Sequence, residues 1–231
     1  MGNKLIATVV GVLKQTPDVL SINFLVNGKP LPAEAGQYIS VYFDDTNVTE
    51  GKAYSLSSCP GDENSQITVK RVGLFSNKIC NLKVGDTFEI SPPYGFFDAF
   101  INQPAIFIGC GVGISPLFSI IRNEINNGGN RPMELYYSNK TNDDIIFSEQ
   151  LHEMSERKNL SVNFYVTREP KSIYYRKRFT VKDLKNVAEN TCFYICGTTE
   201  FTRSIWRQLV ESGVSEKNIS VEVFFGANNG E

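Results

Sequence analysis

The sequence contains few of the residues that several large classes of protein require. It has one histidine, His152, and five cysteines, no two of which form a Cys-x-x-Cys pair. A disulfide scaffold, a zinc ribbon and a plant-type iron–sulfur loop all need cysteine spacings that are missing here. His152 stands in the polar run Glu149-Gln-Leu-His-Glu-Met154, which predicts an exposed helical position. We therefore expect no metal site and no Ser-His-Asp or Cys-His mechanism, and the cysteine usage indicates a reducing, cytoplasmic compartment.

A large charge imbalance and long apolar runs are missing as well. The net charge of the 231 residues is −2, and no stretch of 18 apolar residues occurs. A nucleic-acid partner and a membrane span are therefore not expected. The first residues, Met1-Gly-Asn-Lys-Leu-Ile6, carry neither a signal-peptide core nor a myristoylation signal. With 41% hydrophobic and 21% charged residues, the composition is typical of a globular protein of one large or two small domains.

Residues 1–100 have the pattern of antiparallel β structure. The turn-prone pair Asn27-Gly28 is a strong hairpin signal, and one short helix is expected near Phe75 to Leu82. Short β-rich runs separated by turn residues predict a six-stranded closed barrel. The predicted strands are Leu5–Val10, Val19–Val26, Tyr38–Phe43, Ala53–Ser58, Gln66–Lys70 and Thr87–Ile90.

The pattern changes after Pro92-Pro-Tyr-Gly95, which predicts a domain boundary near residue 100. In residues 101–231 strands alternate with helices, which favours an α/β domain with a parallel sheet and helices on both faces. The predicted strands are Ala105–Cys110, Met133–Ser138, Ser161–Thr167, Cys192–Cys196 and Ile219–Phe224, and the predicted helices are Pro116–Asn126, Ile145–Arg157, Val181–Asn186 and Thr199–Ser212.

The stretch Ala105–Pro116 has the pattern of a buried strand, a glycine turn and a helix. Gly111 and Gly113 let a ligand approach the backbone, and Pro116 fits the first helical position. Free amides and the helix dipole would then face an anion. The spacing Gly111-x-Gly113-x-x-Pro116 lacks the third glycine of the dinucleotide fingerprint. Taken alone, the loop indicates either an anion site or an ordinary strand–helix turn.

Short motifs in a fixed order extend over nearly the whole chain. This ordered set resembles the ferredoxin–NADP reductase superfamily, and most of all its compact bacterial flavin reductases and the reductase modules of oxygenases and flavohaemoglobins, without a fused ferredoxin or globin domain. The resemblance implies a flavin held between the two domains and a nicotinamide cofactor on the second. The motifs are Gly36-Gln-Tyr38, Lys52–Ser58, Val69–Ser76, Gly85-Asp86, Pro92–Gly95, Gly111–Pro116, Cys196-Gly197 and Glu222-Val-Phe224.

The resemblance implies a flavin site on residues 1–100, which form the FAD-binding domain. Tyr54 is expected against the isoalloxazine ring, and Ser55 near the flavin N5, where hydride arrives from nicotinamide C4. Lys52 stands where the family has arginine, so it keeps the charge toward the flavin pyrophosphate without the bidentate geometry, and FMN stays an alternative to FAD. The other flavin contacts implied are Lys70, Val72, Gly73, Ser76 and a covering aromatic ring, either Phe224 or Phe225.

The nicotinamide site is implied on residues 101–231. Cys196 is expected to support the nicotinamide ring, and Glu222 to orient it or to assist proton movement, so that Ser55, Cys196 and Glu222 are the predicted catalytic residues. Basic residues where a carboxylate often marks an NAD enzyme favour NADPH, with NADH as the alternative. The other predicted contacts are Gly111, Val112, Gly113, Pro116, Lys140, Thr167, Arg168, Arg176 and Gly197.

Each of these residues also has a structural interpretation. Tyr54 suits a strand, Ser55 an edge, and Cys196 a buried core position. The resemblance favours an FAD-dependent oxidoreductase that takes electrons from NAD(P)H and passes them to a separate ferredoxin, flavodoxin or oxygenase component. A basic rim of Lys52, Lys78 and Lys83 suits an acidic partner. Two alternatives stay open: a free-flavin reductase or diaphorase, and a non-catalytic electron-transfer subunit of a larger complex.

Overall fold

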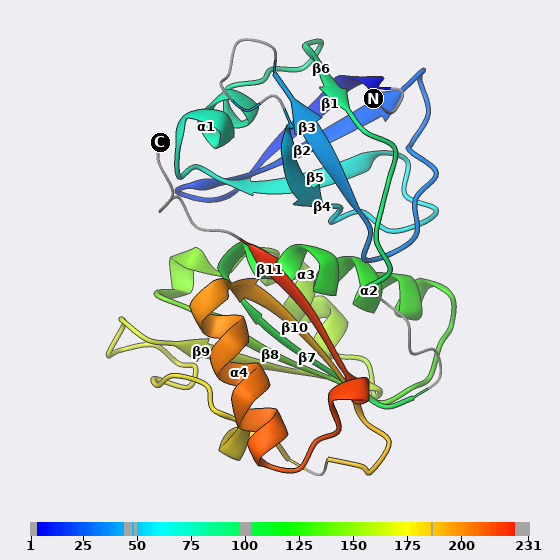
Figure 1. Ribbon diagram of the computed structural model, residues 1–231. Helices are drawn as coiled ribbons and strands as arrows, with labels where there is room; N and C mark the ends of the chain where they lie inside the picture. Colours follow the sequence, from blue (N-terminus) through cyan, green and yellow to red (C-terminus); the bar gives the residue numbers. More distant parts are fainter. Residues whose placement is uncertain (1–3, 44–47, 49, 98–102, 186, 225–231) are drawn as a thin grey trace.

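The computed structural model describes residues 4–43, 48, 50–97, 103–185 and 187–224. Figure 1 shows a β-barrel placed above a parallel sheet that carries helices. The predicted domain boundary near residue 100 falls within residues 98–102, which lie outside the described residues.

The barrel consists of six antiparallel strands in the order β4-β3-β6-β1-β2-β5. The sheet closes where Leu56 bridges Ile67 and the Ser57 N–H donates to the Gln66 carbonyl at 2.8 Å. Apolar side chains that alternate along the strands fill the interior and exclude water. The predicted six-stranded barrel is confirmed. The strands are β1 Leu5–Thr16, β2 Val19–Val26, β3 Tyr38–Tyr42, β4 Lys52–Ser55, β5 Ser65–Lys70 and β6 Thr87–Ile90.

Local details of the barrel differ from the prediction. Asn27 and Gly28 form the expected tight turn, with φ of 52° and 73°, but only Val26 and Lys29 pair across it, so no long hairpin follows. The strand predicted to run to Ser58 ends at Ser55, because the chain there crosses from its β3 partner to β5. The short helix α1 spans Leu74–Cys80, close to the predicted position.

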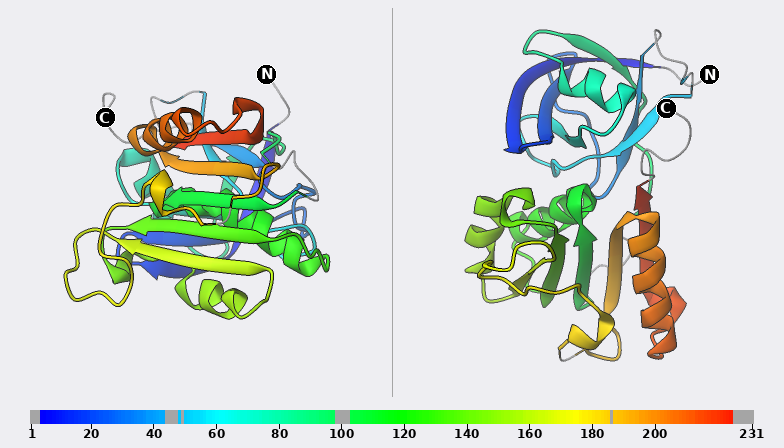
Figure 2. Two further views of the ribbon diagram at one scale, coloured as in Figure 1. Left: turned by 90° about the horizontal axis from the view of Figure 1, so that it is seen from below. Right: turned by 90° about the vertical axis from the view of Figure 1, so that its left-hand side faces the viewer.

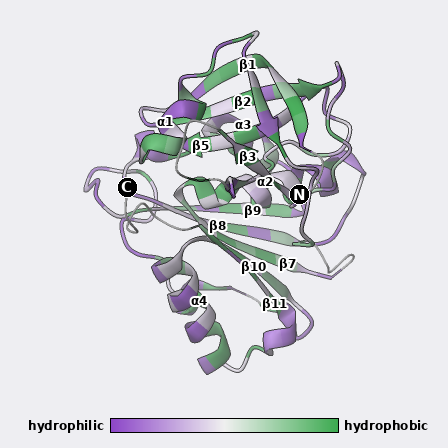
Figure 3. Ribbon diagram, turned by 45° about the horizontal axis from the view of Figure 1, so that its top comes forward, coloured by the Kyte–Doolittle hydropathy of each residue, from purple (hydrophilic) through white to green (hydrophobic). Residues whose placement is uncertain are grey.

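The second domain has five parallel strands in the order β11-β10-β7-β8-β9. Helices α2 and α3 cover one face of this sheet and α4 covers the other (Figure 2). Hydrophobic residues concentrate in the strands, whereas α4 is mixed, as expected for strands covered on both sides (Figure 3). The elements are β7 Ala105–Cys110, α2 Ile114–Asn126, β8 Met133–Asn139, α3 Ser148–Ser155, β9 Leu160–Val166, β10 Cys192–Thr198, α4 Thr199–Glu211 and β11 Ile219–Phe224.

Two predicted helices in this domain are shorter than expected. The helix predicted to begin at Ile145 begins at Ser148, because Phe147 has the left-handed φ of 57° and interrupts the helical backbone. The helix predicted from Val181 to Asn186 is a single 3₁₀ turn, Val181–Asp183, and Asn186 lies outside the described residues. Within the described ranges, none of the helices is long and apolar enough to cross a membrane.

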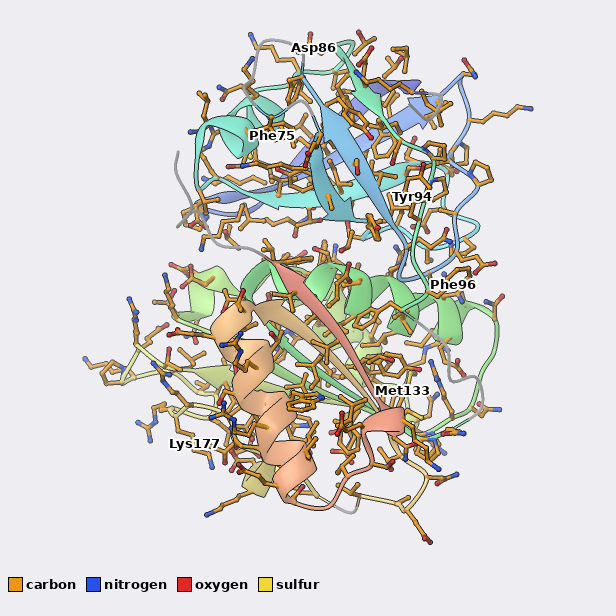
Figure 4. All side chains as sticks on the ribbon, viewed as in Figure 1. Phe75, Asp86, Tyr94, Phe96, Met133 and Lys177 are labelled. Atoms are coloured by element: carbon orange, nitrogen blue, oxygen red, sulfur yellow. The ribbon has the colours of Figure 1, made fainter. Side chains whose placement is uncertain are left out.

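The two domains pack directly against each other. Val19 of the barrel and Phe97 of the connecting segment belong to the apolar core formed by α2, α3 and the sheet. The neighbouring Phe96 is 89% exposed and points away from the protein beside this joint (Figure 4). The core therefore continues from one domain into the other, which fixes how the two halves of the predicted site face each other.

Candidate functional site at the barrel–sheet junction

The carboxyl ends of the parallel strands point toward the barrel (Figure 1). Most of the predicted nicotinamide residues lie at or directly after these strand ends: Gly111, Val112, Gly113, Lys140, Thr167, Arg168, Cys196 and Gly197. The strand β7 ends at Cys110 and leads through the 3₁₀ turn Gly111–Gly113 into α2. Parallel α/β sheets bind ligands at this edge, so the structure brings the predicted loop to the expected place in the fold.

The two glycines of the loop serve different purposes. Gly111 has a φ of 51°, and no heavy atom lies within 4 Å of the place where its Cβ would be. A side chain would therefore be strained there and would project into open space in front of the loop. At Gly113 a Cβ would lie 2.3 Å from the Cys196 carbonyl oxygen. Gly113 is thus required for the loop to pack against β10. Gly111 is required because the backbone of the loop has a positive φ at this position.

Pro116 is not the first helical residue, as the sequence predicted, but the third residue of α2. The prediction was wrong because the glycines continue as a 3₁₀ turn directly into the helix. Proline is still tolerated, since the first turn of a helix has no partners for its N–H groups. The Val112 carbonyl, four residues before Pro116, instead accepts a hydrogen bond of 2.9 Å from the Ser115 hydroxyl.

The three predicted catalytic residues come together. Ser55, at the end of β4, donates a 2.9 Å hydrogen bond to Glu222 Oε1 on β11. Glu222 is in register with Cys196 on the neighbouring strand β10, and Cys196 is in register with Gly109 on β7. Residues from the barrel, from β10 and from the last strand β11 therefore meet at one point between the domains.

Burial is the main cause of the shifted pKa values of Glu222 and Cys196. It raises the pKa of Glu222 to about 7, and the hydrogen bond from Ser55 opposes the rise only in part. Burial also raises the pKa of the Cys196 thiol well above its ordinary value, and the neighbouring Glu222 carboxylate adds to the rise. Cys196 is thus a neutral thiol at physiological pH, and Glu222 is poised to exchange a proton near pH 7.

Unsatisfied polar atoms mark the same edge. Glu222 Oε2 and the Ser138 hydroxyl oxygen are buried without a hydrogen-bond partner. Ser138 is in register with Cys110 at the end of β7. Because buried polar atoms are normally paired, these two are suited to a polar ligand bound at this edge. The sequence indicates the segment Ser138-Asn-Lys140 at the carboxyl end of a parallel strand, but only Lys140 of this segment is among the predicted contacts.

A second residue that the sequence analysis did not select supports the loop from behind. The Tyr137 hydroxyl donates a 2.9 Å hydrogen bond to the Gly111 carbonyl, and the Ile146 N–H donates to the same hydroxyl at 3.4 Å. Tyr137 is fully buried, and burial raises the pKa of its phenol far above the ordinary value, so it stays a neutral donor. In the sequence this residue has the appearance of a core aromatic of β8, which is why no pattern indicated its role.

On the barrel side, the ring of Tyr54 is stacked on Phe75 of α1, with centroids 6.4 Å apart and planes 16° apart. Figure 4 shows Phe75, a residue of helix α1, within the barrel domain. The Lys52 ammonium lies 5.5 Å from the centroid of the Phe75 ring. The structure therefore brings the predicted flavin residues Lys52 and Tyr54 together around one aromatic side chain.

The turn Val72–Ser76, which was predicted to bind the flavin phosphates, is held together by hydrogen bonds to the Ser76 hydroxyl. Ser76 Oγ accepts hydrogen bonds of 3.0 Å from the amides of Val72 and Gly73 and donates to the Gly73 carbonyl. Val72 is 56% exposed. Lys70, which was predicted to lie beside the phosphates, forms an ion pair of 3.0 Å with Asp18.

The predicted phosphate-selecting residues lie together at the ends of β8 and β9. The Arg168 N–H donates to the Lys140 carbonyl at 2.7 Å, and the Thr167 hydroxyl donates to the Asn139 carbonyl at 3.2 Å. All three predicted side chains, of Lys140, Thr167 and Arg168, are exposed. Arg176 lies farther along the loop, where its guanidinium donates to the Pro170 carbonyl at 2.8 Å.

Of the two aromatic candidates for covering the flavin, only one is described. Phe224 is the last residue of β11 and is half-buried, packed against the core of the α/β domain. Phe225 lies outside the described residues.

Two cavities of about 260 and 340 Å³ occur elsewhere, along α2 and α3, and no predicted site residue lines them. Among the described residues, no cluster of His, Cys, Asp or Glu is arranged to hold a metal ion.

Known proteins show the same architecture. Residues 107–207 match the family described as the oxidoreductase NAD-binding domain. The chain is similar to the FAD/NAD-binding domain of a nitric oxide dioxygenase from Vibrio cholerae, with a TM-score of 0.87 and 22% identity over 96% of this chain and 98% of that one. The fold is therefore shared over the full length of that domain.

Two curated relatives match nearly as much of the chain. A flavohemoprotein of Bacillus subtilis is 30% identical over 213 residues, which is 86% of this chain and 53% of the relative. The reductase component of the naphthalene 1,2-dioxygenase/salicylate 5-hydroxylase systems of Ralstonia sp. is 28% identical over 230 residues, which is 94% of this chain and 68% of the relative. The chain thus spans only about half to two thirds of the length of these relatives.

Proposed function

Because residues 107–207 match the oxidoreductase NAD-binding domain and the chain shares the fold of an FAD/NAD-binding domain, we propose that it is an oxidoreductase of the ferredoxin–NADP reductase superfamily. In this proposal it passes hydride from NAD(P)H to bound FAD, and then electrons to a separate acceptor. The observation that carries this proposal is the contact between Ser55 and Glu222, with Cys196 in register beside it. It joins a barrel residue to the edge of the sheet where parallel α/β domains bind nucleotides.

The flavin and the nicotinamide supply the redox chemistry, and the protein supplies position and electrostatics. On the barrel, Lys52, Tyr54 and Ser55 would hold the flavin, together with the turn at Gly73 and Ser76. Lysine offers one compact charge to a pyrophosphate where arginine offers a two-pronged contact. We therefore expect a flavin that is bound mainly through ring packing, and FMN is the alternative to FAD.

On the α/β domain, the loop Gly111–Gly113 would hold the pyrophosphate of the nicotinamide dinucleotide. The unsatisfied Glu222 Oε2 and Ser138 hydroxyl supply polar partners along the same edge. Cys196 is neutral and fully buried in this structure, so a ring would rest against its sulfur only after the groups that cover it move aside. Lys140, Thr167, Arg168 and Arg176 would distinguish NADPH from NADH.

Ser55 and Glu222 contact each other directly, and Ser55 would give up this hydrogen bond if its hydroxyl turned toward a flavin held between the domains. Glu222 then loses the one interaction that lowers its pKa. The carboxyl group consequently becomes more easily protonated when Ser55 turns to the flavin. This gives Glu222 the properties of a hydrogen-bond donor toward the bound nicotinamide at neutral pH.

The experiment that tests the proposal is an absorption spectrum of the purified protein, followed by anaerobic addition of NADPH or NADH. We expect a flavin spectrum that is bleached by at least one nicotinamide. A colourless protein that oxidises NAD(P)H only with added flavin would instead support the free-flavin reductase. Protein that binds nucleotide but reduces no acceptor would support the non-catalytic subunit.

For the acceptor we propose a ferredoxin, a flavodoxin or an oxygenase component. The relative from Ralstonia sp. is named as a ferredoxin–NAD(P)⁺ reductase component of oxygenase systems, which supports this choice. Of the predicted basic rim, Lys83 is exposed, whereas Lys52 and Lys78 are half-buried with their ammonium groups over the rings of Phe75 and Phe43. Positive charge at this rim suits an acidic protein partner. Reduction of cytochrome c in the presence and absence of a candidate ferredoxin measures the transfer. The cytoplasmic location stays a prediction.

A further inference from the structure

Helix α2 holds one turn of the barrel through three side chains on a single face. Ser119, Arg122 and Asn126 are spaced so that they lie above one another along the helix. The buried Ser119 hydroxyl donates to the Ser58 carbonyl at 2.5 Å, and Asn126 Nδ2 donates to Cys59 Sγ at 3.5 Å. Between them, the Arg122 guanidinium donates two hydrogen bonds, of 2.8 and 2.7 Å, to the two oxygens of the Asp62 carboxylate.

The turn that receives these contacts is Cys59-Pro60-Gly61-Asp62. Gly61 has a φ of 90°, and the Asp62 N–H donates to the Cys59 carbonyl at 3.2 Å, as in a type II turn. Asp62 Oδ2 also accepts the Cys59 N–H at 3.0 Å. The same carboxylate therefore closes the turn and binds the helix, so that the turn cannot shift without breaking its contact with Arg122.

Both partners of this contact continue into the candidate site. The turn begins shortly after Ser55, along a segment that is itself held to β5 by the Ser57 N–H. Helix α2 begins directly at the glycine loop Gly111–Gly113. The ion pair thus links the barrel half of the site to the nucleotide half through two short, rigid pieces of chain.

We propose that Asp62 and Arg122 are positioning residues, which set the distance between Ser55 and the nucleotide half of the site. The inference rests on the proposed function. The pair is well suited to the task, because the side chains of Arg122 and Asp62 are only 29% and 23% exposed and are joined by two parallel hydrogen bonds. Such geometry fixes orientation as well as separation. A misplacement of about 1 Å between reacting groups lowers a rate by about 100-fold.

The test compares Asp62→Asn and Arg122→Gln with the wild-type protein and with a matched control. The control is Glu124→Gln, which breaks a different ion pair of the same helix, formed at 3.1 Å with Arg131 inside the α/β domain. Each variant is mixed anaerobically with NADPH and with NADH, and the bleaching of its flavin is followed. Its thermal midpoint and its amide hydrogen exchange are measured alongside.

We expect Asp62→Asn and Arg122→Gln to slow flavin bleaching by about 10- to 100-fold, with little change in the dissociation constant for the nicotinamide. The double variant should be no slower than the slower single variant, because both changes remove one contact. Glu124→Gln should lower the thermal midpoint and leave the bleaching rate within about twofold of the wild type.

Variants that lower the thermal midpoint as Glu124→Gln does, but bleach at the wild-type rate, would show that the ion pair only stabilises the fold. If the wild-type flavin is not reduced at all, the proposed function fails, and hydrogen exchange still decides the positioning role. We expect Asp62→Asn to speed exchange at the Leu56 and Ser57 amides, both of which are hydrogen-bonded within the barrel. Unchanged exchange at these amides would overturn the inference.

Discussion

Ser55 on β4 donates a 2.9 Å hydrogen bond to Glu222 on β11, although the two residues are 167 positions apart and belong to different domains. This contact is the direct link between the two halves of the candidate site. It requires the barrel to close, the parallel sheet to form and the two domains to dock. The pKa of Glu222 and the hydrogen bond of Ser55 therefore depend on the docking of the two domains.

The first prediction concerns the pH dependence of stability. The pKa of Glu222 is about 7 in the folded protein, against an ordinary value of 4.5. Between these values the folded protein binds more protons than the unfolded one. The contribution of this group to stability is therefore fully present below about pH 4.5, and it is lost as the pH rises toward 7. At about 1.4 kcal/mol per pKa unit, the loss is on the order of 3 kcal/mol.

Glu222→Gln should remove this dependence. Thermal unfolding of the wild-type protein and the variant at a series of pH values from about 5 to about 8 gives the difference in Tm. We expect the wild type to lose stability relative to the variant as the pH rises. A difference in Tm that is constant across this range would mean that Glu222 ionises as an ordinary carboxyl group.

The second prediction concerns Ser55. Ser55→Ala removes the donor to Glu222 and, in the proposed mechanism, a polar contact to the flavin. We expect the rate of flavin bleaching by NAD(P)H to fall by about 10- to 100-fold while the flavin stays bound, as for the loss of one positioned hydrogen-bond donor. Stopped-flow absorbance measures the rate. The matched control is Ser57→Ala, since the Ser57 hydroxyl bonds only to Gln66 and Thr68 within the barrel.

The third prediction separates the two ligands by means of the glycine loop. Gly111→Val places a side chain in the open space before the loop and should raise the dissociation constant of the nicotinamide by at least about 10-fold. The flavin should be retained, because its predicted contacts lie on the barrel. Gly128→Val is the control, since Gly128 also has a positive φ, of 72°, and no neighbour within 4 Å of a Cβ. If the Gly111 variant lost its flavin and the Gly128 variant did not, the assignment of the loop to the nicotinamide dinucleotide would be wrong.

The fourth prediction concerns the choice between NADPH and NADH. Arg168→Ala should raise the KM for NADPH by about 10-fold or more and leave the KM for NADH nearly unchanged, because only NADPH carries the extra phosphate. Steady-state oxidation of each nicotinamide measures both values. Arg157→Ala is the control, an exposed arginine just before the opposite end of the same strand, β9. A higher kcat/KM with NADH in the wild-type protein would contradict the predicted preference.

Much of the fold could be predicted because it depends on local patterns. The strand β2 and the strands β6, β7 and β11 have the predicted bounds, since short apolar runs between turn residues have few alternative structures. The predictions failed where backbone geometry depends on neighbours. Phe147 adopts a left-handed conformation that its side chain does not indicate, and its ring is stacked on Phe118 with centroids 4.0 Å apart.

The residues of the candidate site could be selected from the motifs, but their contacts could not. The chain shows Ser55, Cys196 and Glu222 as separate positions, and only strand register brings the last two side by side. The pairing of Asp62 with Arg122 was equally hidden, because a charged residue in a turn and another on a helix are usually solvated. Such pairs form because tertiary packing brings distant residues together, and local sequence patterns do not indicate this packing.

The position of Glu222 on β11 has a consequence for heat inactivation. β11 is one of the two edge strands of the five-stranded sheet and has β10 as its one strand neighbour. Edge strands open at lower free energy than central ones, so β11 can separate from the sheet while the remaining strands stay paired. Such fraying withdraws the carboxyl group and frees Ser55 without melting either core. The protein should therefore lose its turnover on heating several degrees before its secondary structure disappears, and regain it on cooling.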